Sequence, residues 1–334
     1  MDPRLPIKNG TINVQKYIMQ SLAQFPIIFI MNRAFLRMRR QVNFELYVFF
    51  LLPAVILTFI FIYIPMWGAQ IAFRDYIPTK GLMGSTWVGL QHFRRFIGSY
   101  QFLNLMKNTL GISIYQLLAG FPLPVILALM LNQLKNGPFK RFTQTITYAP
   151  HFISVVVLVG LLQVFLNPRN GLLNVLFMAM GRDPIYFLGM QKYFWHLYVI
   201  SGIWQSTGWA TILYLAALAG IDPELYEAAK MDGATRFQRV CYIDIPGIMP
   251  TVVVLFILNT GRLMNVGFEK TYLMQNPLNL GTSEVISTYV YKVGLIQGQF
   301  GFATAVGLFN GVVNLILLLL VDRLAKRLGS GGLL

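Results

Sequence analysis

The chain has 334 residues, of which 56% are hydrophobic and only 12% are charged, whereas soluble domains carry about 25% charged residues. This composition excludes an ordinary soluble domain and indicates an integral membrane protein. The net charge of +15 does not favour a nucleic-acid partner, because the basic residues stand in short stretches between apolar runs, where they set topology and contact anionic membrane lipid.

The first element in chain order, residues 14–31, is a weak membrane candidate. Polar side chains and Pro26 interrupt it, so we predict an interfacial helix within an N-terminal segment of residues 1–45 rather than a span. Six later apolar stretches are each long enough to cross a bilayer, which takes about 20 residues. We therefore predict an all-α integral membrane protein with about six transmembrane helices, at residues 46–68, 108–131, 145–166, 194–219, 247–266 and 302–321.

The distribution of basic residues predicts the orientation. With a cytoplasmic N-terminus, sixteen of the 27 Lys and Arg residues fall on the cytoplasmic side and nine on the other, as the positive-inside rule requires. We therefore expect both termini in the cytoplasm, with a transmembrane domain over residues 46–321 and a cytoplasmic tail over residues 322–334. Residues 222–246 then also form a cytoplasmic loop.

The ionisable residues argue against ion-coupled transport and against catalysis by this chain. None of the twelve carboxylates falls in the middle of a predicted span, which counts against a proton- or sodium-coupled carrier, since such groups are kept in a membrane for function. The three histidines and the single Cys241 lack the spacing of a metal site. No G-x-x-x-x-G-K-S/T phosphate loop occurs. We expect no enzyme activity, no metal and no cofactor here, so any ATP and magnesium must be held by another chain.

The loop at residues 222–246 is predicted to form two short helices. Asp222 is a good N-cap, and Pro223 fits the first helical position. Gly233 can adopt the left-handed conformation that ends a helix. Thr235 can cap a second short helix that runs through Tyr242, and the following proline leads into the next span. From the residues alone, an ordinary capped loop and a docking surface fit equally well.

This loop resembles the coupling loop of binding-protein-dependent ABC importer permeases, whose pattern is E-A-A, three residues, G, nine residues, I-x-L-P. Every spacing matches, and the one departure is Ile245 in place of leucine. The resemblance implies a type I ABC importer permease fold and a helix that sits in a cleft of a separate ATPase subunit. The residues that it assigns to ATPase coupling are Glu227, Ala228, Ala229, Asp232, Gly233, Ile243 and Pro246.

The resemblance also implies partners and a substrate class. The partners would be a second homologous permease subunit, two ABC ATPases and an extracytoplasmic solute-binding protein, in a bacterial cytoplasmic membrane. Residues 87–96 (WVGLQHFRRF) resemble the sugar permeases related to the maltose system. Residues 139–154 (FKRFTQTITYAPHFIS) resemble the branch for lipoprotein-linked, aldouronate and alginate uptake. The expected cargo is an oligosaccharide, with an acidic, uronate-containing one as the more specific hypothesis.

Residues that line the pathway are harder to predict. Asn259, Arg262 and Asn265 are spaced by three and would share one face of a helix, and Arg262 would suit a uronate. Aromatic and amide side chains of other spans can also hydrogen-bond a sugar. Helix–helix hydrogen bonding and, for Arg262, snorkelling to the interface explain these residues equally well. The further candidates are Trp204, Tyr214 and Asn310.

Two interpretations from other classes stay open. A self-contained carrier or channel would work without an ATPase. A membrane scaffold without a transport role would show no substrate-stimulated ATP hydrolysis in the assembled complex. Dependence of transport on a separate ATPase distinguishes an importer permease from both.

Overall fold

The computed structural model describes residues 48–327. The chain divides into two units, Met1–Gly68 and Ala69–Leu334. The predicted interfacial segment at residues 14–31 and the end of the predicted tail, residues 328–334, lie outside the described residues.

The described part of the first unit, from Val48 onward, is one apolar helix with no buried residue in its later turns. It contains a π-helical turn, η1 (Phe59–Tyr63), followed by α3 (Ile64–Met66). Pro65 explains this turn, because a proline ring clashes with the carbonyl four residues earlier, and that carbonyl belongs to Phe61 within η1. A wider turn moves the carbonyl away from the ring.

The second unit opens with a small antiparallel hairpin. Strands β1 (Arg74–Asp75) and β2 (Thr86–Trp87) pair with Arg74 opposite Trp87, and the Arg74 guanidinium lies 5.4 Å from the Trp87 ring centroid. The hairpin packs on the start of α18 (Phe300–Arg327) at Gly301, where an added Cβ would stand 2.6 Å from the Arg74 carbonyl oxygen. Only a glycine allows this approach.

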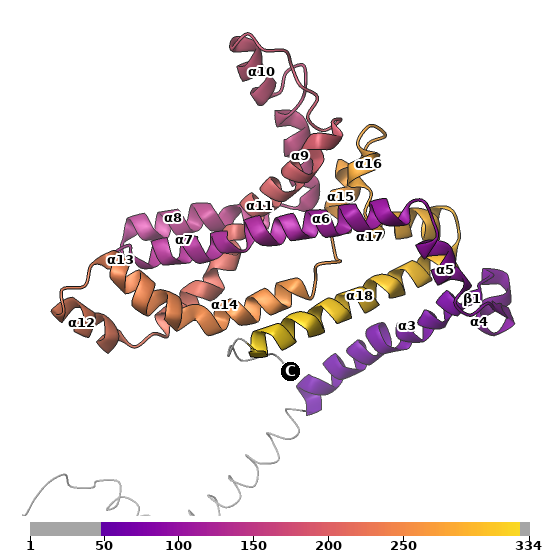
Figure 1. The fold of residues 1–334 in the computed structure, drawn as a ribbon, viewed down its shortest axis with the longest axis horizontal. Helices are drawn as coiled ribbons and strands as arrows, with labels where there is room; N and C mark the ends of the chain where they lie inside the picture. Colours follow the sequence, from indigo (N-terminus) through magenta and orange to yellow (C-terminus); the bar gives the residue numbers. More distant parts are fainter. Residues whose placement is uncertain (1–47, 328–334) are drawn as a thin grey trace, which may run out of the picture. The chain divides into compact units, whose positions relative to one another are not determined.

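A bundle of long helices makes up most of the second unit, with α11 (Gln191–Ala219) at its centre (Figure 1). α11 packs against α6, α7, α8 and α14, and α14 packs against α18. The bounds of these neighbours are α6 (Phe102–Gly120), α7 (Pro122–Asn132), α8 (Pro138–Tyr148) and α14 (Ile245–Thr260).

Shorter elements connect the long helices and cover their ends. They are η2 (Trp67–Phe73), η3 (Pro78–Lys80), α4 (Gly81–Gly84), α5 (Gln91–Ile97), η4 (Ala149–Phe152), α9 (Val155–Phe165), α10 (Leu172–Ala179), α12 (Pro223–Met231), α13 (Arg236–Arg239), η5 (Val240–Asp244), α15 (Phe268–Met274), α16 (Leu280–Ser283), α17 (Ile286–Tyr291) and η6 (Lys292–Ile296).

The contact between α8 and α11 depends on Gly208. An added Cβ at Gly208 would lie 1.9 Å from the carbonyl oxygen of Thr147, so no larger residue fits without separating the two helices. Gly247, at the start of α14, likewise leaves no room, since its added Cβ would lie 2.6 Å from the Ile221 side chain. Small residues at these crossings let backbones approach closely, as is common between membrane helices.

The predicted span at residues 145–166 is not one straight helix. The segment Pro138–Phe152 and the segment Val155–Phe165 meet at an angle of 98°. The break frees backbone groups, and side chains satisfy some of them: Ser154 caps α9 by accepting from the Val157 N–H, and the Gln205 amide donates to the Ile153 carbonyl at 2.7 Å. A break at membrane depth is tolerated when neighbours supply such bonds.

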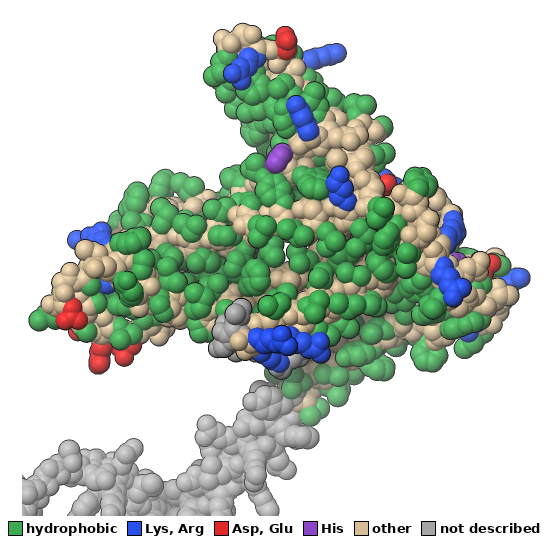
Figure 2. Space-filling view, viewed as in Figure 1, with side chains coloured by type: hydrophobic (Ala, Val, Ile, Leu, Met, Phe, Trp, Pro, Cys, Tyr) green, Lys and Arg blue, Asp and Glu red, His purple; other side chains and the backbone are tan. Residues whose placement is uncertain are grey.

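Four helices among the described residues are long and apolar enough to span a membrane, and a fifth candidate is the bent pair at 138–165. The helix at the predicted span 194–219 is present as α11, but it is not among the segments that pass this test. Figure 2 shows apolar side chains over most of the visible face of the long helices. The four candidates are Val48–Phe73, Phe102–Asn132, Arg236–Thr260 and Phe300–Arg327.

Candidate functional site

The elbow, defined as residues 222–246, starts as predicted. The Asp222 side chain accepts a hydrogen bond from the Glu224 N–H at 2.9 Å, and Pro223 occupies the first position of α12. Glu224 in the first turn places negative charge near the positive end of the helix dipole. The local sequence alone therefore determines where α12 begins.

The end of α12 is a Schellman motif centred on Gly233. Gly233 has a φ of +73°, and its N–H donates to the Lys230 carbonyl at 3.1 Å, while the Ala234 N–H donates to the Ala229 carbonyl at 2.9 Å. This 6→1 and 5→2 pairing satisfies the last carbonyls of the helix. The predicted role of Gly233 as the left-handed residue is confirmed.

The second half of the elbow differs from the prediction. Thr235 does cap the next helix, in a reciprocal capping box with Gln238. However, α13, the π turn η5 and α14 form one continuous helix, Arg236–Thr260, so no separate second helix ends at Tyr242. Pro246 again explains the π turn, since its ring would clash with the Tyr242 carbonyl in a regular α-helix.

The surface of the elbow is exposed and partly apolar. Met231, Phe237 and Tyr242 precede the predicted span at residues 247–266 and are 89%, 76% and 80% exposed. A group of large exposed side chains outside a span is typical of a surface that meets a partner. A hollow of about 180 Å³ lies between the two halves of the elbow, lined by Ala229, Ala234, Gln238, Arg239, Tyr242 and Ile243. In Figure 2, acidic side chains gather at the end of the second unit that carries α12.

The predicted coupling residues lie on or beside this surface. Glu227, Ala228, Asp232, Gly233 and Pro246 are exposed, whereas Ala229 and Ile243 are half-buried. All seven thus lie on one short segment, and five of them are open to a partner.

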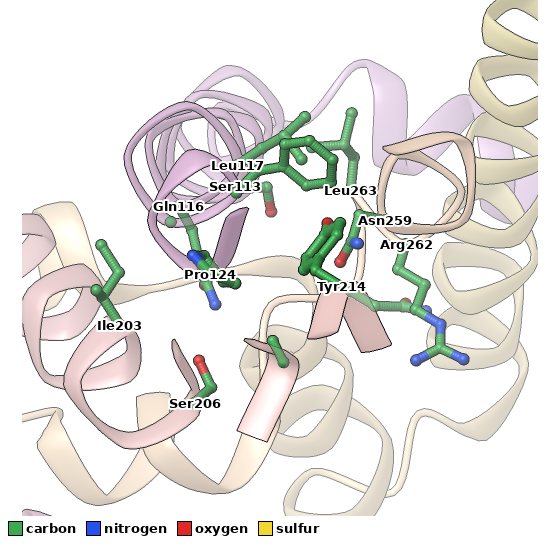
Figure 3. Close-up of a pocket in the computed structure, with 14 residues that line it drawn as sticks. Ser113, Gln116, Leu117, Pro124, Ile203, Ser206, Tyr214, Asn259, Arg262 and Leu263 are labelled. Atoms are coloured by element: carbon green, nitrogen blue, oxygen red, sulfur yellow. The ribbon is translucent and has the colours of Figure 1, made fainter. Parts of the chain in front are cut away.

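A polar cavity of about 240 Å³, here called the central cavity, lies among α6, α7, α11 and the end of α14. Figure 3 shows side chains from these separate elements around one space, including Gln116, Tyr214, Asn259 and Arg262. No carboxylate of residues 48–327 forms an ion pair with Arg262. The central cavity therefore carries an exposed cation and several amide and hydroxyl groups.

Three predicted pathway residues line this cavity, but not for the predicted reason. Asn259, Arg262 and Asn265 all contribute to its wall. The helix ends at Thr260, so Arg262 and Asn265 lie in the turn that follows it, and the prediction of a shared helix face is wrong. The turn brings them together instead, with the Asn265 N–H donating to the Arg262 carbonyl at 2.8 Å.

Of the other candidates, Tyr214 lines the cavity, Asn310 lies behind it and Trp204 lies elsewhere. The Asn310 amide donates to the Asn265 side-chain oxygen at 3.4 Å, so it supports a lining residue. Trp204 lines a separate apolar groove of about 420 Å³ between α7, α8 and α11.

Sequence reasoning missed three polar lining residues, Ser113, Gln116 and Ser206. A signal was available for the first two, because polar residues three positions apart within an apolar run share a helix face. Ser206 offers no such signal, since its helix is polar on several sides.

Comparison with known proteins identifies the family. Residues 120–330 match the family described as binding-protein-dependent transport system inner membrane component. The chain belongs to this family of permeases. It is thus a multi-pass inner-membrane component of a binding-protein-dependent ABC importer, a membrane permease and not itself an enzyme.

Named relatives agree with this assignment. The permease is 47% identical over 283 residues to the polygalacturonan/rhamnogalacturonan transport system permease protein YteP of Bacillus subtilis (strain 168), which covers 85% of this chain and 88% of the relative. It is 44% identical to the protein LplB of the same organism, over 85% and 89% of the two chains.

A solved structure confirms the predicted fold of the permease. A chain from the crystal structure of a bacterial alginate ABC transporter, in complex with an alginate pentasaccharide-bound periplasmic protein, matches with a TM-score of 0.79 and 40% identity. The match covers 89% of the permease and all of the other chain.

Proposed function

We propose that this permease passes an acidic, uronate-containing oligosaccharide across the cytoplasmic membrane, with the central cavity as part of the pathway. The position of Arg262 in the cavity wall is the observation that supports this proposal most directly. Its side chain stands on the cavity wall beside amide and hydroxyl groups and has no ion-pair partner in the described part of the chain. A guanidinium can bind a carboxylate through two parallel hydrogen bonds, and the polar groups suit sugar hydroxyls.

The names of the relatives support an acidic cargo. The 47% identical relative is named for polygalacturonan and rhamnogalacturonan, and the transporter of the matching crystal structure is named for alginate. These polysaccharides consist of uronic acids or contain them. A cationic residue on the pathway suits all of them, because each carries carboxylates.

The size of the central cavity supports a shared pathway. Its volume of about 240 Å³ is below the roughly 300–1,000 Å³ of sites that enclose a small molecule. An oligosaccharide needs more room, so this chain supplies one wall and a homologous permease subunit supplies the other. A solute-binding protein delivers the sugar from outside.

ATP hydrolysis by the partner subunits acts on this permease through the elbow. Two ABC ATPases bind ATP and magnesium on their own chains, and one of them receives α12 in a cleft on the cytoplasmic side. Glu227 and Asp232 make polar contacts there, Ala228 and Ala229 allow close packing, and Gly233 fixes the bend. The exposed apolar side chains of the elbow support this docking.

Substituting Arg262 tests the pathway. In proteoliposomes that hold the whole importer, Arg262→Gln should lower uptake of a uronate oligosaccharide about tenfold, whereas Arg262→Lys, which keeps a charge, should lower it about threefold. Uptake of a neutral oligosaccharide of equal length should change little. Unchanged uptake of the acidic substrate in Arg262→Gln would exclude the role of Arg262.

Substituting Gly233 tests the ATPase coupling. A proline at φ +73° cannot adopt the native backbone, since proline fixes φ near −65°, so Gly233→Pro should abolish uptake while the spans stay helical by circular dichroism. Intact uptake by a folded Gly233→Pro variant would favour a self-contained carrier or channel instead.

A further inference from the structure

Asp244 is a fully buried carboxylate at the joint between the elbow and α14, with 0% exposure. Removing a carboxylate from water is costly unless hydrogen bonds or a counter-charge replace the lost hydration. For Asp244, the hydrogen bonds that replace the lost hydration come from two other helices. The contacts of Asp244 therefore show which parts of the chain are held together at this point.

Each oxygen of Asp244 accepts a hydrogen bond from a different element. The Tyr226 hydroxyl of α12 donates to Oδ1 at 2.5 Å, and the Gln133 amide, at the end of α7, donates to Oδ2 at 2.9 Å. Burial raises the pKa of Tyr226 to about 12, and the hydrogen bond and charge of Asp244 act in the same direction. The tyrosine hydroxyl thus keeps its proton and remains a donor across the physiological range.

Little else fastens α12 to the rest of the molecule. α12 has no buried residue, and within residues 48–327 Tyr226 is its one side chain that hydrogen-bonds to another element. The backbone continues at both ends of α12, but the turn at Gly233 joins it only to α13 of the same elbow. Tyr226 is therefore the side chain that links α12 to the membrane helices, through its bond to Asp244 and a further hydrogen bond with Asn132 at the end of α7.

The two helices joined at Asp244 also reach the central cavity. Pro124 of α7 and Asn259 of α14 both line it. α14 follows Asp244 directly, and its sixteen residues extend about 24 Å at 1.5 Å per residue. Asp244 thus stands where a displacement of α12 can move two walls of the cavity together.

We infer that Asp244 is the positioning residue through which movement of α12 is passed to α7 and α14, by way of Tyr226 and Gln133. The inference rests on the proposed function, since it requires that an ATPase moves α12. Asp244 contacts neither ATP nor sugar. It acts by keeping three helix ends at fixed distances while the elbow is displaced.

The test measures the number of ATP molecules hydrolysed per oligosaccharide imported, in proteoliposomes with the complete importer and its binding protein. Asp244→Ala breaks both hydrogen bonds and should raise this ratio about tenfold, while Tyr226→Phe and Gln133→Ala each break one and should raise it about threefold. Asp244→Asn can keep both bonds once the Gln133 amide turns round, so its ratio should stay within about twofold of the wild type.

Two matched controls remove a carboxylate and a tyrosine hydroxyl at positions outside the elbow. Asp75→Ala removes an exposed carboxylate from the hairpin, and Tyr100→Phe removes the hydroxyl of a tyrosine that is 91% exposed. Neither should change the ratio. Copurification of the ATPase subunits with each variant shows whether docking is intact.

The outcomes separate the inference from the proposed function. A raised ratio with bound ATPases, restored by Asp244→Asn, supports the inference. A wild-type ratio in both Asp244→Ala and Tyr226→Phe overturns it, as does loss of the ATPases from the complex, since Asp244 would then serve docking. If Asp244→Ala fails to assemble in the membrane, Tyr226→Phe decides by itself. If the wild-type importer itself shows no ATP-dependent uptake, the proposed function fails.

Discussion

The elbow and the central cavity are built in opposite ways. The elbow is one continuous segment whose shape is fixed by neighbours in sequence, such as Asp222 with Glu224 and Thr235 with Gln238. The cavity takes its wall from several helices that are far apart in the chain. The elbow presents large side chains to its surroundings, whereas the cavity presents polar groups to an internal space. A change in the elbow should thus affect every substrate alike, and a change in the cavity should affect some substrates more than others.

The largest expected effect is at the end of α12. Gly233→Val forces a β-branched residue into a φ of +73°, which such residues rarely adopt, so the Schellman motif should be lost and uptake of every oligosaccharide should fall about a hundredfold or more. Gly181→Val is the matched control, because Gly181 has a φ of +74° and open space around it but lies outside the elbow.

The readout for this pair is substrate-stimulated ATP hydrolysis by the reconstituted importer. Both variants have the same backbone strain, so a general loss of stability should affect both. An equal loss of hydrolysis in the two would contradict the special role of the elbow.

A change within the cavity should be selective. Gln116→Leu replaces an amide of the cavity wall by an apolar side chain, so uptake should fall about tenfold through loss of hydrogen bonds to the sugar, while basal ATP hydrolysis stays the same. Gln101→Leu, just before the start of α6, should leave both unchanged. If Gln116→Leu lowered basal hydrolysis as much as uptake, the separation between elbow and cavity would be wrong.

A change in the packing of α8 against α11 should lower the stability of the whole protein, and so affect the elbow and the cavity alike. Gly208→Ala places a Cβ 1.9 Å from the Thr147 carbonyl oxygen, so α8 and α11 must move apart, at a cost of about 1–3 kcal/mol. The melting temperature of the purified protein should fall by several degrees. Gly160→Ala, whose added Cβ would meet no packed neighbour within 4 Å, should melt at or slightly above the wild-type temperature, since alanine is the better helix former.

The smallest effect concerns Lys270, which follows α14 and donates to the Tyr198 carbonyl at 2.8 Å. Burial lowers its pKa from 10.5 to about 8, so folding favours the neutral amine. The cost of burying the charged form is fully present below pH 8 and fades as the pH rises toward 10.5. Lys270→Met should therefore melt a few degrees higher than the wild type at pH 7, and the difference should shrink toward pH 10.5.

A pH-independent difference between Lys270→Met and the wild type would show that packing and not charge governs this site. Melting of both proteins in matched detergent buffers at several pH values provides the measurement.

The elbow could be predicted from sequence because its causes are local. An aspartate before a proline, a glycine at the turn and a threonine three residues before a glutamine each act within a few residues. The continuation of α13 into α14 was missed, because Pro246 predicts the end of a helix, and whether a wider turn accommodates the proline instead depends on the surrounding structure.

The cavity could be predicted only in part. Polar residues near the end of the fifth predicted span indicated Arg262 and its neighbours, although the helix stops at Thr260. Trp204 lines a different groove, because an aromatic residue gives no sign of which side of α11 faces the cavity. The burial of Asp244 could not be foreseen, since it depends on Gln133, which lies 111 residues away.

The π turn η5 also sets the rotational phase of the long helix. A π turn inserts one extra residue into an α-helix, so deleting one residue from Val240–Asp244 would remove that extra residue from the helix that joins the elbow to Thr260. Each residue of an α-helix turns the chain by about 100°. Everything beyond the deletion would therefore face another direction relative to the elbow, and Asn259 would leave the cavity wall while every side chain on α14 stayed the same. The extra residue therefore fixes the rotation of one end of the helix relative to the other.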